Sequence, residues 1–201
     1  MNTAIKFLKS SAIYFVGNVL TKVISFFLLP LYTSYIATAD MGYYQLSTTY
    51  LYILIPIVYM EVWSGIMRYM FDYKKQGEKY IIVMNGAVLF LFSTVLYSVV
   101  IVILGFAFDI RYLLLIFLYG LFITIQNIYS CIARALGYSS VFAFSGIVGS
   151  LVNSISNIVM ILAFNMRLSS LYISLIFGLV IQIFIMELKI KLRKNMSIKM
   201  V

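Results

Sequence analysis

The chain has 201 residues, of which 64% are hydrophobic and 10% are charged, and its mean hydropathy is +1.05. A soluble domain of this length cannot bury so much apolar surface, so the composition excludes a soluble protein. The chain has no histidine and one cysteine, Cys131, and its six acidic residues are scattered. These counts exclude disulfides and the usual zinc sites, and they predict no metal and no cofactor.

Six apolar segments make up most of the chain. Each contains 18 residues or more, which is enough for an α-helix to cross about 30 Å of hydrocarbon. The sequence therefore predicts an all-α integral membrane protein with six transmembrane helices. In chain order, the predicted spans are Ser11–Ile36, Tyr43–Met67, Ile81–Gly105, Tyr112–Cys131, Val141–Phe164 and Ser169–Met186.

Lysine and arginine are distributed unevenly around these spans. Arg111 and Arg167 fall in the loops after the third and fifth spans, and Lys22 lies inside the first. The other twelve lie before the first span or after the second, fourth and sixth, at Lys6, Lys9, Arg68, Lys74, Lys75, Lys79, Arg134, Lys189, Lys191, Arg193, Lys194 and Lys199. Because basic residues stay on the cytoplasmic side, this pattern predicts that both termini are cytoplasmic. The net charge of +9 is then a topology signal that also attracts anionic lipid headgroups, and no nucleic-acid partner is expected.

A polar face is predicted in the first span, where Asn18, Lys22 and Ser25 are spaced as on one side of a helix. Lys22 lies about 16 Å along the helix from Ser11, near the middle of the bilayer. Lys22 either snorkels or pairs structurally, or it lines a cavity and binds an anionic substrate. Contact with lipid at that depth costs several kcal/mol, so we expect Lys22 to face the helix bundle or its cavity.

The second span carries Glu61 and Arg68 on one helical face. By helical rise, Glu61 differs in depth from Lys22 by about one turn, so these two side chains could meet. Such a pair would either neutralise two buried charges or act as a proton- or ion-linked switch. Pro30 and Pro56 lie inside the first two spans, where each removes a helical hydrogen bond and permits a bend.

The fifth span contains a stripe of small and amide residues at helical spacing. The stripe is either a seam at which helices pack or a cavity wall that hydrogen-bonds sugar hydroxyls. The third span has only Asn85 and scattered hydroxyls, so we expect it to face lipid. The residues of the stripe are Gly146, Ser150, Asn153 and Asn157, with Gly149 beside it. The fourth span adds Gly120, Thr124, Asn127 and Cys131, and the sixth adds Ser174, Gly178 and Gln182.

Three stretches together carry a resemblance to a known family. Residues 17–44 read GNVLTKVISFFLLPLYTSYIATADMGYY, with a mid-helix lysine, a Leu-Pro-Leu sequence and a loop that closes in Gly-Tyr-Tyr. Residues 61–75 read EVWSGIMRYMFDYKK, and residues 133–137 read ARALG ahead of the Gly/Ser/Asn-rich fifth span. In this order of features the chain resembles the N-terminal half of the polysaccharide-biosynthesis flippases. These form the lipid-linked oligosaccharide branch of the superfamily (MOP) that also contains the multidrug and toxic-compound extrusion (MATE) exporters.

The resemblance implies a MATE-like fold and a flippase function. Such transporters have about 12–14 spans in two lobes, which rock around a central cavity to alternate access. Their substrate would be an undecaprenyl-diphosphate-linked glycan, moved to the outer leaflet of the bacterial cytoplasmic membrane. Residues 1–201 would form a single lobe that works with a second six-helix lobe or as a homodimer, or that is a truncated product.

The resemblance also suggests roles for individual residues. Lys22 matches the cation that would meet the diphosphate, and Arg68 and Arg134 match arginines on the cytoplasmic side, although topology-setting is the favoured role for Arg134. The resemblance and the polar faces together predict the substrate-binding residues. These candidates are Lys22, Asn18, Ser25, Glu61, Arg68, Asn153 and Asn157.

Other classes of function remain open. A MATE-type exporter of drugs or cations is disfavoured by a lysine, rather than an acid, in the first span. A non-transporting membrane fragment or accessory subunit is a further alternative. Membrane enzymes need clustered acids, metal ligands or large outer loops bearing arginine and histidine, so an enzyme is not expected.

Overall fold

The computed structural model describes residues 19, 22–23, 26, 28–73 and 76–192. Within these residues the chain is helical and contains no strand, which confirms the predicted all-α class. A helical segment at residues 28–35 precedes the others. The following helices are α2 (Thr38–Tyr59), α3 (Val62–Asp72), α4 (Gln76–Phe108), α5 (Leu113–Ala135), α6 (Ser139–Leu162) and α7 (Leu168–Ile190).

Four of the described helices are long and apolar enough to cross a membrane, namely α5, α6, α7 and the part of α4 from Lys79 onward. α2 and α3 together form a fifth candidate span, which is bent by 51°. These five correspond to the second to sixth predicted spans, with ends shifted by a few residues. The first predicted span, Ser11–Ile36, lies largely outside the described residues, so the complete six-helix lobe stays a prediction.

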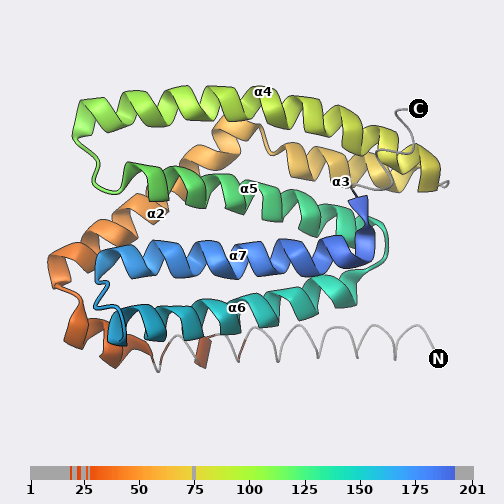
Figure 1. Ribbon diagram of the computed structural model, residues 1–201. Coiled ribbons are helices and arrows are strands. Elements are labelled where there is room, and N and C mark those ends of the chain that lie inside the picture. Colours follow the sequence, from red (N-terminus) through yellow and green to blue (C-terminus); the bar gives the residue numbers. More distant parts are fainter. Residues whose placement is uncertain (1–18, 20–21, 24–25, 27, 74–75, 193–201) are drawn as a thin grey trace.

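The long helices lie side by side in the order α4, α5, α7, α6 (Figure 1). α7 packs between α5 and α6, and α3 packs against both α4 and α5. α2 runs obliquely across this layer and contacts α4, α5 and α7 (Figure 1). The bent pair of α2 and α3 therefore packs against α4, α5 and α7.

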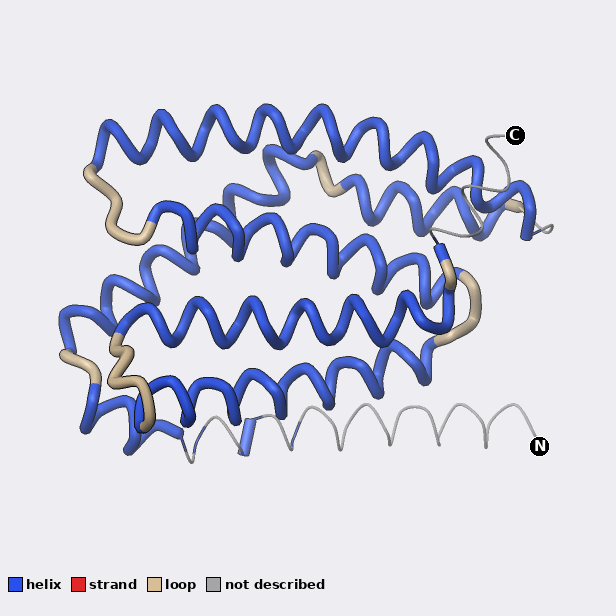
Figure 2. Tube along the Cα trace, viewed as in Figure 1, coloured by secondary structure: helices blue, strands red, loops and turns tan. Residues whose placement is uncertain are grey.

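The turns between helices gather at two ends of the bundle (Figure 2). The α4–α5 and α6–α7 turns lie at one end, which we call the Arg111 end, where Arg111 pairs with Asp40 at 3.4 Å. The α5–α6 turn lies at the other end, the Arg134 end. There the Lys79 Nζ donates to the Ala135 carbonyl at 3.3 Å, and Lys189 lies over the Tyr138 ring.

Reporter fusions provide a direct test of this arrangement in the membrane. We expect fusions at Asp109 and Arg167 to report the outside, because their end of the bundle holds few cations. Fusions at Lys79 and Arg134 should report the cytoplasm. A cytoplasmic signal from Asp109, or the same signal from Lys79 and Arg167, would contradict the predicted topology.

The predicted span Tyr43–Met67 is broken at Met60 and Glu61. Both residues adopt left-handed backbone conformations, with φ of 49° and 48°, and the Glu61 N–H donates to the Pro56 carbonyl at 3.2 Å. Proline removes the hydrogen bond to the carbonyl four residues before it, whereas this break comes after Pro56, whose carbonyl accepts the Glu61 N–H. The span is bent by 51°, as the presence of a proline allowed, and the bend lies at Met60 and Glu61.

The apolar core forms two clusters along the bundle. The first surrounds the fully buried Tyr59, Tyr97 and Tyr172, and the second surrounds Met70 and Met186. α4 contributes little to either and exposes a long row of aliphatic and phenylalanine side chains. This exposure agrees with the expectation that the third span faces lipid.

Candidate functional site

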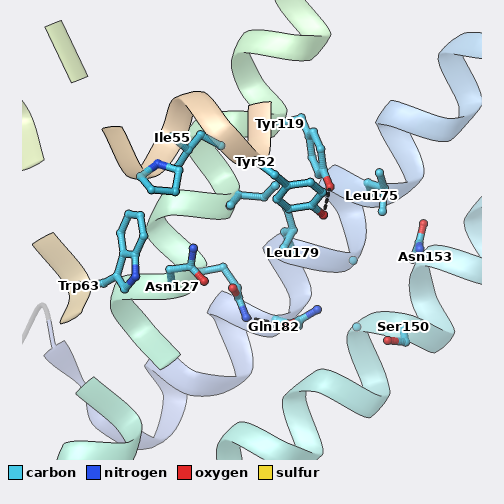
Figure 3. Close-up of a pocket in the computed structure, with 15 residues that line it drawn as sticks. Tyr52, Ile55, Trp63, Tyr119, Asn127, Ser150, Asn153, Leu175, Leu179 and Gln182 are labelled. Atoms are coloured by element: carbon cyan, nitrogen blue, oxygen red, sulfur yellow. Dashed lines mark hydrogen bonds between the residues drawn. The ribbon is translucent and has the colours of Figure 1, made fainter. Parts of the chain in front are cut away.

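A partly open cavity of about 290 Å³ lies among α2, α3, α5, α6 and α7 (Figure 3). We call it the polar cavity, because amide and hydroxyl groups line it and none of the described lining residues is charged. The polar residues are Gln126, Asn127, Ser150, Asn153 and Gln182, and the aromatic residues are Tyr52, Trp63 and Tyr119. The remaining lining is aliphatic, proline or glycine.

The polar cavity lies near the middle of the helices. α5, α6 and α7 have 23 or 24 residues each, which corresponds to about 35 Å of helix. Measured from the Arg134 end, Gln182 lies about 12 Å along α7, Gln126 about 14 Å along α5 and Asn153 about 21 Å along α6. Uncompensated polar groups at this depth would be costly in a bilayer, so their clustering makes the cavity the candidate functional site.

Two glutamines join α5 to α7 at the cavity. The Gln126 Nε2 donates to the Gln182 Oε1 at 3.0 Å and to the Ser130 Oγ at 3.0 Å. Because both amide hydrogens of Gln126 are used, its side chain is held in one orientation. Gln182 is thereby fixed against the cavity rather than turned toward lipid.

Two glycines allow α6 and α7 to approach closely beside this network. A Cβ atom at Gly178 would lie 2.7 Å from the Gly149 carbonyl oxygen and 3.0 Å from the Asn153 Cβ. A Cβ atom at Gly149 would collide with the Gln182 side chain. Small residues at such crossings let membrane helices pack closely, so the packing-seam interpretation is confirmed at Gly149. At Ser150 and Asn153 the same helix lines a cavity.

Asn153 and Asn157 each keep an unpaired amide oxygen. In the described part of the chain, both Oδ1 atoms are buried and accept no hydrogen bond. The Asn157 Nδ2 donates to the Tyr32 hydroxyl at 3.0 Å, which ties α6 to the helical segment before α2. Asn153 lines the polar cavity with its amide side chain, although its Oδ1 is itself buried.

Aromatic side chains from the bent pair close the cavity toward α2 and α3. The Tyr52 and Tyr119 hydroxyls are 3.0 Å apart and hydrogen-bonded (Figure 3). Trp63 lies in the first turn of α3, just after the break, and Pro56 lies just before it. The bend therefore brings aromatic rings opposite the amides of α6 and α7.

The structure separates the predicted substrate-binding residues. Asn153 lines the polar cavity, whereas Asn157 is buried against Tyr32. Lys22 and Arg68 are exposed. The predictions for Asn18 and Ser25 concern residues outside the described part of the chain.

Glu61 is exposed at the helix break, where its carboxylate accepts a hydrogen bond from the Ser64 Oγ at 3.2 Å. Among the described residues Glu61 forms no ion pair with Lys22, and the structure shows the Asp40–Arg111 pair instead. Neither Lys22 nor Glu61 is enclosed by the helices of this chain. The expectation that both side chains face the helix bundle or its cavity, and not lipid, stays a prediction.

Arg134 is held at the end of α5. Its Nε donates to the Ser130 carbonyl at 3.2 Å, its Nη2 contacts the Cys131 sulfur at 3.3 Å, and its guanidinium lies over the Phe142 ring. The favoured role of Arg134 in setting topology stays a prediction.

Sequence reasoning missed Gln126, Tyr52, Trp63 and Tyr119. Gln126 and Ser130 are four residues apart, so helical spacing could have identified this pair. The aromatic residues gave no such signal, because they come together only through the bend and the crossing of α2 over α5.

Comparison with known proteins adds no relative, since no family model, curated protein or solved structure matches this chain. What the fold and the cavity define is therefore a class, a helical protein with several apolar helices suited to a membrane.

Proposed function

We propose that this chain is one lobe of a membrane transporter that flips a polyprenyl-diphosphate-linked oligosaccharide, with the polar cavity contacting the sugars. The uncharged lining of the cavity supports this proposal most directly. Amide and hydroxyl groups can exchange hydrogen bonds with sugar hydroxyls, and aromatic rings offer apolar faces with polar edges. The chain is proposed to act by transport, without chemistry of its own.

The same lining provides no acidic counterpart for a cationic drug. A cation in a low-dielectric environment is stabilised by a carboxylate or by aromatic faces, and the described lining offers only the aromatic faces of Tyr52, Trp63 and Tyr119. Glu61 and Asp40 lie elsewhere, at the helix break and at the Arg111 end.

The size of the polar cavity supports a half-site. A volume of about 290 Å³ is at the lower limit of ligand pockets, and the cavity is partly open. We infer that it forms one wall of a larger passage whose other wall comes from a second lobe or a second copy. Parallel repeats around a midplane site are an established transporter architecture.

Lys22 provides the test of the lipid-linked part of the proposal. The Lys22→Gln variant of the full chain should bind polyprenyl-diphosphate oligosaccharide at least about tenfold more weakly in native mass spectrometry, since its ammonium would contact the diphosphate. The Lys22→Arg variant should retain part of the affinity, because charge persists while geometry changes. Binding rather than transport is measured, so a missing second lobe does not obscure the result.

Lys191→Gln is the matched control, because Lys191 is exposed beyond the end of α7. We expect its affinity for the glycolipid to equal that of the wild type. Equal binding by all variants, or binding of organic cations with no binding of the glycolipid, would overturn the proposal.

A further inference from the structure

The bend between α2 and α3 opens a groove on the other side of α2. α3 stays against α4, and Ile66 of α3 fills the space beside Gly86 of α4. α2 leaves this direction by 51°, so α2 and α4 diverge toward the Arg111 end (Figure 1). The resulting groove has a volume of about 620 Å³ and lies between α2 and α4, closed by the start of α5.

The groove is almost entirely apolar. One wall is a single face of α2, with Leu46, Tyr50, Ile53 and Ile57 at helical spacing, all exposed on this chain. Leu104 and Phe108 of α4 are among the residues of the opposite wall, and Ile110 and Ile116 close the groove. Leu46 to Ile57 spans about 16 Å along the helix, so the groove is a long slot.

A cation lies at the mouth of this slot. Arg111 follows the lining residue Ile110, and its guanidinium lies 4.9 Å from the centre of the Tyr43 ring, which also lines the groove. The Tyr43 hydroxyl donates to the Arg111 carbonyl at 2.8 Å, which fixes the backbone there. The Arg111 side chain is 60% exposed, although it pairs with Asp40 at 3.4 Å.

We propose that this groove binds an anionic diacyl phospholipid, with an acyl chain in the slot and the phosphate at Arg111. A guanidinium has five N–H donors, so the single contact with Asp40 leaves donors for a phosphate. The nearby Asp40 carboxylate offsets part of the positive charge, which suits a singly charged phosphodiester better than a diphosphate. The site is separate from the polar cavity and does not depend on the proposed transport function.

Native mass spectrometry of the full-length protein tests this site. The added lipid is phosphatidylglycerol or phosphatidylcholine, both with identical acyl chains. We expect the wild type to bind phosphatidylglycerol about fivefold more tightly, which corresponds to one headgroup contact with arginine. Arg111→Gln should remove this preference. Arg167→Gln is the matched control and should keep the preference, because Arg167 is exposed at the same end but, unlike Arg111, is not adjacent in sequence to a residue that lines the groove.

Ile53→Trp tests whether an acyl chain of the lipid occupies the slot, because the larger tryptophan side chain would fill that space. This variant should lower the binding of both lipids while leaving their ratio unchanged. Equal binding of the two lipids by the wild type would overturn the proposal, as would equal losses in Arg111→Gln and Arg167→Gln. Unchanged binding of both lipids by Ile53→Trp would overturn it as well.

Discussion

Replacing Asn153 with leucine should weaken binding of the lipid-linked oligosaccharide by about tenfold or more, because the polar cavity loses one of the amides that line it. Both side chains have four heavy atoms in the same branched arrangement, so the change removes hydrogen-bonding capacity and keeps the shape of the side chain. The Asn153 Oδ1 has no hydrogen-bond partner in the described part of the chain. Its removal therefore costs no internal hydrogen bond, and thermal stability should be unchanged or raised.

Measuring both affinity and thermal stability distinguishes a binding residue from a packing residue. Weaker glycolipid binding without a loss of thermal stability is expected of a binding residue. Asn85→Leu is the matched control, since Asn85 is exposed on α4 and does not line the polar cavity, and it should leave glycolipid binding unchanged. Native mass spectrometry and a thermal melt of the same preparations provide both readouts. A variant at Asn153 that melts earlier but binds normally would assign this residue to helix packing alone.

Gly178→Ala should destabilise the protein by about 1–3 kcal/mol, because the added methyl group overpacks the crossing of α6 and α7. The Cβ atom would lie 2.7 Å from a backbone oxygen, that of Gly149. A backbone atom cannot rotate away as a side chain can, so the two helices must separate. Thermal unfolding of the purified protein in detergent micelles measures the loss.

Gly146→Ala is the control for this substitution. Gly146 lies on α6, and a Cβ atom there would meet nothing within 4 Å. Since alanine favours helix over glycine by about 0.5–1 kcal/mol, this variant should be as stable as the wild type or more so. The assignment of Gly178 to the helix crossing would be wrong if both variants melted at the same temperature.

The spans could be predicted from the sequence because hydropathy depends on local composition. The run from Ile81 to Gly105 lies within α4, and the charge-poor and charge-rich loops fall at opposite ends of the described bundle. The stripe on the fifth span identified Ser150 and Asn153, since periodicity places both on one face. These features need no knowledge of which helices are neighbours.

The rest of the site depends on contacts between distant segments. Gln126 is held by Gln182, 56 residues further along, and Tyr52 meets Tyr119 only because α2 crosses α5. At the break, Met60 and Glu61 adopt left-handed conformations although neither is glycine. The sequence therefore contains no glycine that would have predicted a turn there. Pro56 indicated that a bend was possible but could not give its direction.

The oblique α2 forms a partition between two compartments. Tyr52 and Ile55 lie on its side toward the polar cavity, while Ile53 and Ile57 lie on its side toward the apolar groove. Any tilt or rotation of this helix enlarges one volume at the expense of the other. By thermodynamic linkage, occupants that favour different positions of α2 then change each other's affinity by the same factor. With the proposed phospholipid in the groove, the lipid composition of the bilayer would then change the affinity of the polar cavity for its ligand.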